Sequence, residues 1–507
     1  MPRSVLCATL LVMAAFAASR VAILGEASER EYDEGVYLLS ARSVVAGHPL
    51  FTSVFSSQPP AFLETLAAAM RLAGDSLETA RMLILAFSLL SLAAVADLGR
   101  RLAGPWAAPA AAAALALSAR FGDLGHVVQA ETPALAMALL SLCAALHARA
   151  RLWHRAWLAA SGGLMALALL FKLLVAPMLL PLGLLLLFAP SRGPNGDWET
   201  DGRGTSLCRR AAARAFVVAS GALVALALPL LRYDSAAFFE QTVGFHLAKR
   251  EVFGPNPLGN VWRLLQQLPA DGVVLASAVA GAALLARARP RAASWLGVWM
   301  LWMSLALALQ TPLFWRHFIL YAPPLALAAA ALPVFLAERR RSRTPAFWVA
   351  VAVTLWALPP LLLPRQVDAM FPLIPEAPRH EIAAESLRDT ALWIRRQTKP
   401  DEMVGGDDPM AVYLAGRQAP PRLCDTSLAR IASRSLELRE ATTHSLAARV
   451  LVLRREGRLS RSLPGYLAWV KRNYRLVQDP ATGLEPARSV WLRRPNARPS
   501  PLPRKPR

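Results

Sequence analysis

Two carboxylates stand side by side just after the first apolar block of the chain. Asp33 and Glu34 lie in the run EYDEG at residues 31–35, which opens an amphipathic stretch over residues 34–47. A carboxylate at a membrane surface can take the proton of an acceptor hydroxyl, and a carboxylate pair can hold a divalent cation such as Mg²⁺ or Mn²⁺. The same residues also suit the start of a helix, with Asp33 as N-cap and Glu34 at the positive helix end. Their spacing leaves both interpretations open.

A third carboxylate, Glu131, lies near the start of an apolar block in the run HVVQAETPA. A charged group that enters an apolar membrane helix is costly, so a polar cavity or partner is expected around it. Thr132 and Pro133 favour the alternative that Glu131 is a first-turn residue of a helix. His126, five residues earlier, is predicted to be an interfacial histidine rather than a metal ligand.

Two cations interrupt or begin apolar segments. Lys172 is the only charged residue between positions 156 and 191. Snorkelling to the membrane interface would accommodate its ammonium group without a function, and the alternative is a fixed cation that binds the phosphate of a lipid. Arg316, followed by His317, begins another apolar block. An Arg side chain can bind phosphate oxygens through two parallel hydrogen bonds.

Three further residues have the spacing of one helical face. His246, Lys249 and Arg250 stand at positions i, i+3 and i+4 in a segment between two apolar blocks. A solvated basic face is the simpler interpretation, and a phosphate-binding face is the alternative.

The composition indicates that these residues belong to a membrane protein. Of the 507 residues, 55% are hydrophobic and 18% are charged, against roughly 45–50% and about 25% in soluble domains. This excludes a soluble enzyme, a disordered chain and a collagen-like fibre. Only five of the 56 basic residues are Lys, and this preference for Arg indicates a GC-rich bacterial genome. The four cysteines are scattered, which predicts neither a disulfide framework nor a zinc site.

Eleven apolar blocks are each expected to cross a hydrocarbon core about 30 Å thick. They cover residues 4–24, 79–98, 104–120, 127–148, 156–171, 173–190, 213–231, 272–287, 292–310, 317–337 and 345–363. The first block could be a signal peptide, but its length and the many spans that follow favour an uncleaved helix.

Arginines in the short loops predict the orientation, because cytoplasmic loops carry an excess of basic residues. If the N-terminus is cytoplasmic, each short cytoplasmic loop carries at least two Arg, whereas the first outer loop, 25–78, has eight acidic and three basic residues. An odd number of spans then places the chain beyond about residue 365 outside the cytoplasm. The net charge of +22 is thus explained by topology and by a basic outer domain that faces anionic lipid, and no nucleic acid partner is expected.

The predicted domains follow from this division. Residues 1–365 form a membrane domain, 366–495 an extracytoplasmic α/β domain and 496–507 a disordered tail rich in Pro and Arg. In the α/β domain we expect helices at 381–398, 410–416 and 464–474, and strands at 402–405, 450–453 and 489–492. Phe238, Phe239, Phe245 and Trp262 of the 232–271 loop predict helices that lie in the plane of the membrane interface.

Taken in order, these residues resemble the GT-C membrane glycosyltransferases of the family-39 type. That family includes the protein O-mannosyltransferases and the bacterial transferases that put aminoarabinose on lipid A. The resemblance covers residues 1–365, and the run YLAGR at 413–417 is also typical of bacterial members. The matching runs are DEGVYLLSAR from Asp33, GHPLF at 47–51, SQPPAF at 57–62, ETP from Glu131, Phe171-Lys172, and Arg316-His317 before a Pro-rich span.

The resemblance implies a mainly α, polytopic GT-C fold and the transfer of a hexose or pentose. The donor would be a polyprenyl-phosphate sugar, and the acceptor a lipid, glycan or protein at the extracytoplasmic face of the bacterial inner membrane. Asp33 would be the catalytic base, with Glu34 and Glu131 as its helpers, and Lys172 and Arg316 would bind the donor phosphate.

The remaining candidates come from the same regions of the chain. Lys249 and Arg250 are further candidates for the donor phosphate, and the candidate substrate contacts are Gln58, His126, His246 and His317. Two departures from the family concern the acceptor class more than the fold. Gln58 stands where many relatives have a basic residue, and Glu131 stands where Asp is common.

A transporter or flippase of a lipid-linked intermediate is the alternative. Transporters usually place polar residues near the midplane of broken helices, often within repeated halves. Here the spans have almost no ionisable residues except at their ends, and no internal repeat is visible. A receptor or purely structural membrane protein would leave the outward-facing charged set unexplained. The glycosyltransferase interpretation is therefore preferred.

Overall fold

The computed structural model describes residues 1–26, 32–148, 154–188, 191–192, 198–199, 204–339, 345–362, 384–454, 457–478 and 488–497. The chain divides into two compact units. The membrane unit comprises Met1–Ile23, Met82–Leu231 and Pro255–Pro372, and the loop unit comprises Leu24–Arg81, Arg232–Gly254 and Leu373–Arg507. The predicted domain boundary at 365–366 and residues 498–507 of the predicted tail lie outside the described residues.

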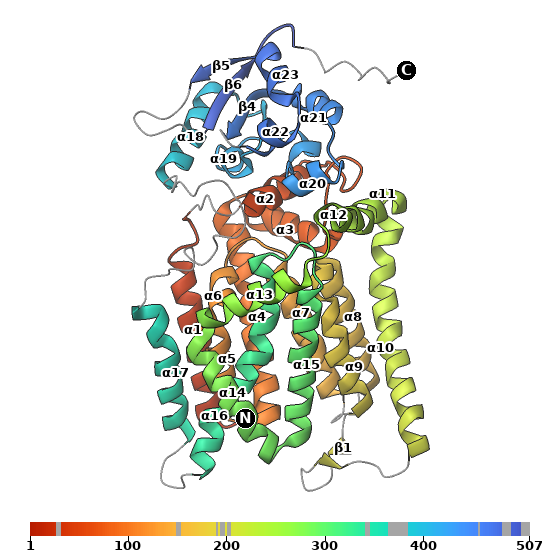
Figure 1. Ribbon diagram of the computed structural model, residues 1–507, viewed down its shortest axis with the longest axis vertical. Coiled ribbons are helices and arrows are strands. Elements are labelled where there is room, and N and C mark those ends of the chain that lie inside the picture. The colour runs from red at the N-terminus through yellow and green to blue at the C-terminus, as the bar shows by residue number, and fades with distance from the viewer. Residues whose placement is uncertain are drawn as a thin grey trace. The chain divides into compact units, whose positions relative to one another are not determined.

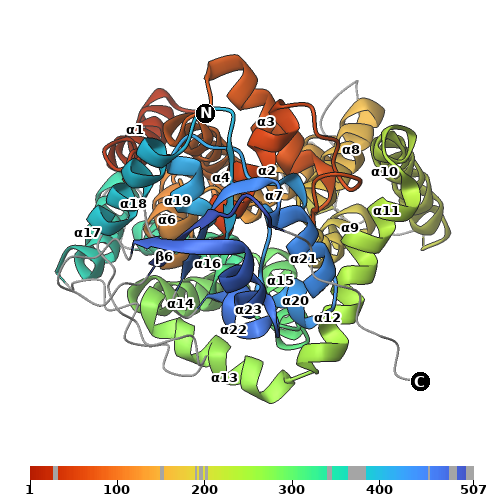
Figure 2. The same cartoon turned by 90° about the horizontal axis from the view of Figure 1, so that it is seen from above.

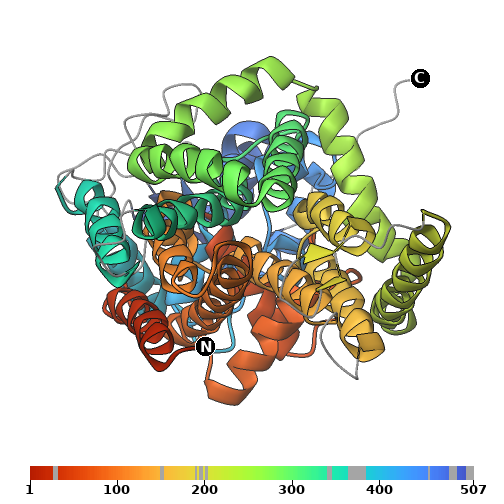
Figure 3. The same cartoon turned by 90° about the horizontal axis from the view of Figure 1, so that it is seen from below.

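The membrane unit is a set of apolar helices that stand side by side, as the end-on view of Figure 3 shows. Its elements are α1 (Arg3–Val21), α4 (Leu77–Ala103, which begins in the loop unit), α5 (Ala107–Leu117), α6 (Ala119–Leu124), α7 (Glu131–His147), α8 (His154–Phe171), η1 (Leu173–Met178), α9 (Leu179–Phe188), the two-residue strands β1 (Ser191–Arg192) and β2 (Trp198–Glu199), α10 (Gly204–Arg232), α13 (Pro257–Gln267), η3 (Leu268–Asp271), α14 (Gly272–Ala288), α15 (Pro290–Ala308), η4 (Trp315–Tyr321), α16 (Ala322–Arg339) and α17 (Pro345–Leu362).

Each of the eleven predicted blocks contains one of these helices, which confirms the mainly helical membrane fold. Five segments of the described chain are long and apolar enough to cross a membrane. They are Arg3–Val21, Leu77–Ala103, His154–Phe171, Pro257–Ala288 and Trp315–Glu338, and shorter apolar helices accompany them.

The Ala-rich third block differs from a membrane-spanning helix. It forms α5, which has 11 residues and is therefore about 17 Å long, far less than the hydrocarbon core. Residues 107–115 of α5 are all buried, and the helix packs against α1 and α16. Alanine suits this interior position because small side chains let neighbouring helices approach closely.

The loop unit combines two segments between membrane helices with the C-terminal domain. The first segments form α2 (Tyr32–Val45), α3 (Pro60–Ala73), α11 (Ser235–Phe239), the π-helical turn η2 (Glu240–Gly244) and α12 (Phe245–Phe253). The C-terminal domain contains α18 (Ala384–Gln397), β3 (Met403–Gly406), α19 (Pro409–Leu414), η6 (Pro421–Leu423), α20 (Leu428–Ala432), α21 (Leu438–Ser445), β4 (Ala448–Arg454), α22 (Arg458–Ser462), α23 (Tyr466–Asn473), β5 (Tyr474–Gln478) and β6 (Arg488–Arg493).

The C-terminal domain has a mixed four-stranded sheet in the order β3-β4-β6-β5 (Figure 1). β3 pairs parallel with β4, while β6 pairs antiparallel with both β4 and β5. Leu451 and Leu453 of β4 join a buried cluster with Trp491 of β6 and Trp469 of α23. The small α/β domain predicted from the sequence is thus confirmed. Strand β5 was missed, because its first residue ended the predicted helix 464–474.

Helix α2 is more deeply buried than its amphipathic pattern predicted. The sequence indicated one buried face, whereas every residue from Glu34 to Val44 is buried. The reason is that α3 packs on α2 (Figure 2) and α19 of the C-terminal domain packs on it as well. Helix α2 is therefore an interior helix of the loop unit, and the C-terminal domain covers part of it.

Side-chain contacts fix α2 to the C-terminal domain near both of its ends. The Tyr32 hydroxyl accepts a hydrogen bond from Thr426 N (2.9 Å), and the Arg458 guanidinium lies 3.5 Å from the centre of the Tyr32 ring. Near the other end, Arg42 donates to Asp75 (2.5 Å) and to the carbonyl oxygens of residues 413 and 417 (3.0 Å each).

Between these ends, Gly35 lets the backbones of α2 and α19 touch. A Cβ atom at Gly35 would lie 2.5 Å from Met410 N and 2.9 Å from Met410 Cα. The obstacle is backbone rather than a flexible side chain, so one of the two helices would have to move.

We therefore expect Gly35→Ala to loosen the packing of α2 on α19. Overpacking of a rigid contact typically costs about 1–3 kcal/mol, which would appear as a lower melting temperature of the purified protein in detergent. Gly244→Ala is the matched control, because the nearest atom to its Cβ would lie at 3.8 Å. An equal melting temperature for both variants would contradict this packing.

Candidate functional site

In the membrane unit, one buried carboxylate lies beside two cations. Glu131 Oε1 is 2.6 Å from Lys172 Nζ and 3.2 Å from Arg316 Nε. The side chain of Glu131 is fully buried, and those of Lys172 and Arg316 are 8% and 17% exposed. Residues separated by 185 positions in the sequence thus form one cluster, here called the Glu131 triad.

Each member of the triad stands where a helix begins or breaks. Glu131 is the first residue of α7, Lys172 separates α8 from η1 in an extended conformation (φ −161°), and Arg316 lies in the first turn of η4. A break at Lys172 turns its side chain toward Glu131 instead of along the surface of a continuous apolar helix. The ion pair at 2.6 Å favours the fixed cation over a snorkelling side chain.

The charges of the triad sum to +1. The carboxylate compensates part of the cost of burying two cations. Ammonium and guanidinium groups are the side chains that bind phosphate oxygens through charge-assisted hydrogen bonds. The triad therefore contains the side-chain types that a phosphate site requires.

Two predicted histidines of the membrane unit lie near triad residues in the sequence, His317 next to Arg316 and His126 five residues before Glu131. His317 is 5% exposed, and its Nδ1 accepts a hydrogen bond from Phe314 N (3.4 Å), which closes the start of η4 behind Arg316. His126 is half-buried between α6 and α7. The guanidinium of Arg120 lies 5.2 Å from the ring centre of Trp315. Arg120 was not predicted from the sequence, because it is the last residue of an apolar block.

In the loop unit, Glu34 makes an ion pair with Arg81. Arg81 Nε and Nη2 donate to the two carboxylate oxygens of Glu34 at 2.8 and 2.7 Å, and Arg81 Nη1 donates to the carbonyl oxygens of Leu24 (3.0 Å) and Glu26 (2.7 Å). The side chains are 0% and 2% exposed. Both carboxylate oxygens of Glu34 are thus bound by Arg81 at the start of α2.

Asp33 is half-buried in the first turn of α2. Helix α2 begins at Tyr32, one residue earlier, so Asp33 does not occupy the N-cap position that the sequence suggested. Asp33 interacts electrostatically with a second carboxylate, that of Asp425 in the C-terminal domain. Burial raises the pKa of Asp425, Arg430 opposes that rise, and the negative charge of Asp33 adds to it. The sequence gave no signal for Asp425, which is 392 positions away.

Other predicted residues of the loop unit gather around the turn that precedes α3. His246 Nε2 lies 3.0 Å from the carbonyl oxygen of Ser57, and Gln58 Nε2 donates to the hydroxyl of Ser57 (3.3 Å). Lys249 is 8% exposed whereas Arg250 is exposed. The expected common face of His246, Lys249 and Arg250 is therefore divided, because only the first two turn toward the protein.

The structure thus groups the predicted residues within two separate units. Glu131, Lys172 and Arg316 meet in the membrane unit, while Asp33, Glu34, Gln58, His246, Lys249 and Arg250 belong to the loop unit. Within the described parts of the chain, no three His, Cys, Asp or Glu side chains form a group that could hold a metal ion.

The ion pair between Arg81 and Glu34 gives a prediction for stability. Arg81→Met leaves a buried carboxylate without its partner, which typically costs about 3–5 kcal/mol. We expect a clearly lower melting temperature, and substantial recovery in the double variant Arg81→Met/Glu34→Leu, which has no buried charge. Arg71→Met is the control, because Arg71 is exposed and donates to one carbonyl oxygen. An unchanged melting temperature in Arg81→Met would contradict the structural role of the pair.

Comparison with known proteins relates both units to one fold. Residues 57–195 match the family model described as dolichyl-phosphate-mannose-protein mannosyltransferase. No curated protein matches the chain. The crystal structure of ArnT from Cupriavidus metallidurans bound to undecaprenyl phosphate is 15% identical, with a TM-score of 0.60 over 97% of this chain and 99% of that chain.

Two further structures are similar to the chain. The apo state of the same ArnT is 15% identical, with a TM-score of 0.51 over 90% of this chain and 92% of that chain. The archaeal oligosaccharyltransferase AglB from Archaeoglobus fulgidus is 14% identical, with a TM-score of 0.45 over 92% of this chain and 72% of that chain. The chain therefore has the GT-C fold of ArnT, and the resemblance to GT-C membrane glycosyltransferases predicted from its sequence is confirmed.

Proposed function

We propose that this protein is a membrane glycosyltransferase that moves a sugar from a polyprenyl-phosphate donor to an acceptor hydroxyl. The observation that carries the proposal is the Glu131 triad, a cluster of two cations around one buried carboxylate at the ends of apolar helices. The fold of ArnT, whose crystal structure contains undecaprenyl phosphate, and the mannosyltransferase family match support it. The donated sugar is a hexose or pentose, and the acceptor is a lipid, glycan or protein.

In this proposal, Lys172 and Arg316 bind the donor phosphate. The phosphate becomes the leaving group when the bond between the sugar and its oxygen breaks, and fixed cations stabilise the negative charge that develops there. Glu131 takes the role of orienting the two cations, since both lie within 3.2 Å of its Oε1 atom. Lys249, which is nearly buried in the loop unit, and the exposed Arg250 remain weaker candidates for phosphate binding.

Asp33 is the proposed base. A base must accept the proton of the acceptor hydroxyl as that oxygen forms its bond to the sugar. Asp33 is half-buried, and the neighbouring Glu34 holds its helix in place through Arg81. Gln58, His126, His246 and His317 are proposed contacts to substrate or to the segments that hold it. A divalent cation at Asp33 remains a proposal from the sequence.

We also propose the location of the reaction. The Arg-rich short loops predict a cytoplasmic N-terminus and a C-terminal domain at the extracytoplasmic face of the bacterial inner membrane. A polyprenyl-phosphate donor is itself a membrane lipid, so a site at the ends of apolar helices suits a substrate with a charged head and a hydrocarbon tail.

Asp33→Asn tests the base. The substitution keeps the size of the side chain but removes its ability to accept a proton, so turnover should fall by about 10²–10⁴-fold. Sugar transfer from a polyprenyl-phosphate donor to membrane extracts of the host would be measured by mass spectrometry. Asp234→Asn is the matched control. Asp234 caps α11 by accepting from Ala237 N (2.8 Å), and Asn caps a helix about as well as Asp. Near-normal transfer by Asp33→Asn would remove it from this role.

Lys172→Met and Arg316→Lys test the phosphate site. Loss of one charged hydrogen bond should weaken binding of the bare polyprenyl phosphate by about 1.5–3 kcal/mol, or roughly ten- to hundred-fold. Arg316→Lys keeps the charge but removes the planar fork, so a bidentate contact predicts a similar loss. Lys172→Met should still fold, because Arg316 stays beside Glu131. Arg155→Met, at an exposed Arg, is the control.

Binding would be measured with purified variants in nanodiscs. Wild-type affinity in both Lys172→Met and Arg316→Lys would exclude the triad from the donor site. The search would then move to His246, Lys249 and Arg250 of the loop unit.

A further inference from the structure

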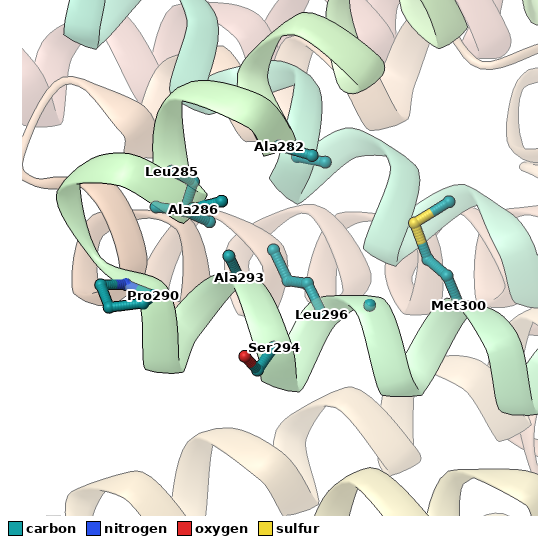
Figure 4. A pocket seen from close by; sticks show the side chains of 10 residues that line it. Ala282, Leu285, Ala286, Pro290, Ala293, Ser294, Leu296 and Met300 are labelled. Atoms are coloured by element: carbon teal, nitrogen blue, oxygen red, sulfur yellow. The ribbon is translucent and has the colours of Figure 1, made fainter.

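The membrane unit contains an apolar cavity of about 390 Å³ at the turn between α14 and α15 (Figure 4). Its lining comes from the last turns of α14, the first turns of α15 and one residue of α16. The side chains on the two sides are small, with Ala282 and Ala286 on α14 and Ala293 and Gly297 on α15. Two helices that pack along such small residues would normally close the space between them, so the open cavity needs an explanation.

The floor of the cavity is rigid. A Cβ atom at Gly281 would lie 2.1 Å from the carbonyl oxygen of Ala328, so the backbones of α14 and α16 are already in contact. Leu285 and Leu296 are 0% and 3% exposed and fill the space beneath. Helix α14 therefore cannot move closer to α16, so Ala328 of α16 stays at the base of the gap between α14 and α15.

The lining selects a hydrocarbon ligand. Apart from the hydroxyl of Ser294, the lining side chains are apolar, and water needs two to four polar partners in a buried site. The cavity follows α15 from Pro290 to Met300, which corresponds to about 15 Å of helix. That length is about half of a hydrocarbon core of about 30 Å, so the cavity suits an acyl chain from a single leaflet.

The mouth of the cavity is strongly basic. Arg287, Arg289 and Arg291 lie at the turn, and the hairpin from Gly272 to Ala308 has no acidic residue. Arg289 donates to the carbonyl oxygen of Leu102 (2.9 Å), which fastens the turn to α4. Arg287 and Arg291 are exposed. Basic residues next to an apolar groove attract anionic lipid head groups.

We propose that this cavity binds one acyl chain of an anionic diacyl phospholipid, with its phosphate at Arg287 and Arg291. The chain fills the wedge between α14 and α15 that the protein's own side chains leave open. A polyprenyl tail is a poorer occupant, because the cavity is only as deep as one leaflet. This lipid site is separate from the Glu131 triad and does not depend on the proposed glycosyltransferase activity.

The test compares two lipids with the same acyl chains on the full-length protein. Purified protein in detergent is incubated with phosphatidylglycerol or phosphatidylcholine, and lipid retained after washing is counted by native mass spectrometry. We expect preferential retention of one phosphatidylglycerol. Gly297→Leu should reduce this retention at least ten-fold, because it fills the cavity at a position where nothing lies within 4 Å of the added Cβ. The double variant Arg287→Ser/Arg291→Ser should abolish the preference for the anionic lipid.

Matched controls separate this site from general lipid adsorption. Gly183→Leu makes the same change on α9, where the added Cβ also meets nothing within 4 Å, and Arg155→Ser removes an exposed Arg next to another apolar helix. Both controls should retain phosphatidylglycerol like the wild type. Equal retention of the two lipids, wild-type retention in Gly297→Leu, or displacement of phosphatidylglycerol by bare polyprenyl phosphate would each overturn the proposal.

Discussion

The cost of burying a charge is the constraint on which both units depend. An isolated ion in an apolar interior is unfavourable by several kcal/mol, so a buried carboxylate needs a cation of good geometry. The chain meets this requirement twice. Glu131 in the membrane unit lies beside Lys172 and Arg316, and both oxygens of Glu34 in the loop unit accept hydrogen bonds from Nε and Nη2 of Arg81. The two arrangements differ in their charge balance. Glu34 faces one guanidinium, whereas Glu131 faces two cations of the types that bind phosphate oxygens.

Two glutamates that look alike in the sequence therefore have different surroundings in the structure. The resemblance to the glycosyltransferase family implied that Glu34 and Glu131 both assist Asp33. In the structure, each of these two glutamates is engaged with its own cations, and Asp33 is the carboxylate of the pair that is half-buried at the start of α2. The proposed base, Asp33, therefore differs from Glu34 in its exposure and in the side chains around it. The spacing of the two residues in the sequence does not reveal this difference.

Local properties were predictable, and long-range partners were not. Hydropathy located a helix in each of the eleven blocks, because an apolar run long enough for a membrane has few other structures available. Lys172 and Arg316 stood out for the same reason, as charges where apolar residues were expected.

Arg81 gave no such signal, since it lies in the first turns of a helix among other polar residues. Arg120 was hidden at the end of a block, and the negative charge of Asp33 contributes to the raised pKa of Asp425, 392 positions away. The burial of α2 on all sides was also not predictable, because α19, which covers it, belongs to a domain encoded more than 360 residues later.

The contact between α2 and α19 indicates what the C-terminal domain contributes to the first loop segment, which contains α2. Asp408 caps α19 by accepting from Ala411 N (3.3 Å), and its other oxygen binds Arg454 (3.3 Å) and Arg488. Burial alone would raise the pKa of Asp408, but these two guanidinium groups lower it far below its usual range, so the cap stays charged.

The capped end of α19 meets the backbone of α2 at Gly35, two residues after Asp33. A proton-accepting group must be held within hydrogen-bond reach of its target, and a short helix in a loop has little rigidity by itself. The sheet that carries Arg454 and Arg488 thus fixes α19, and α19 fixes the helix that presents Asp33. The domain's contribution to catalysis would be the position of Asp33 rather than a reacting group of its own.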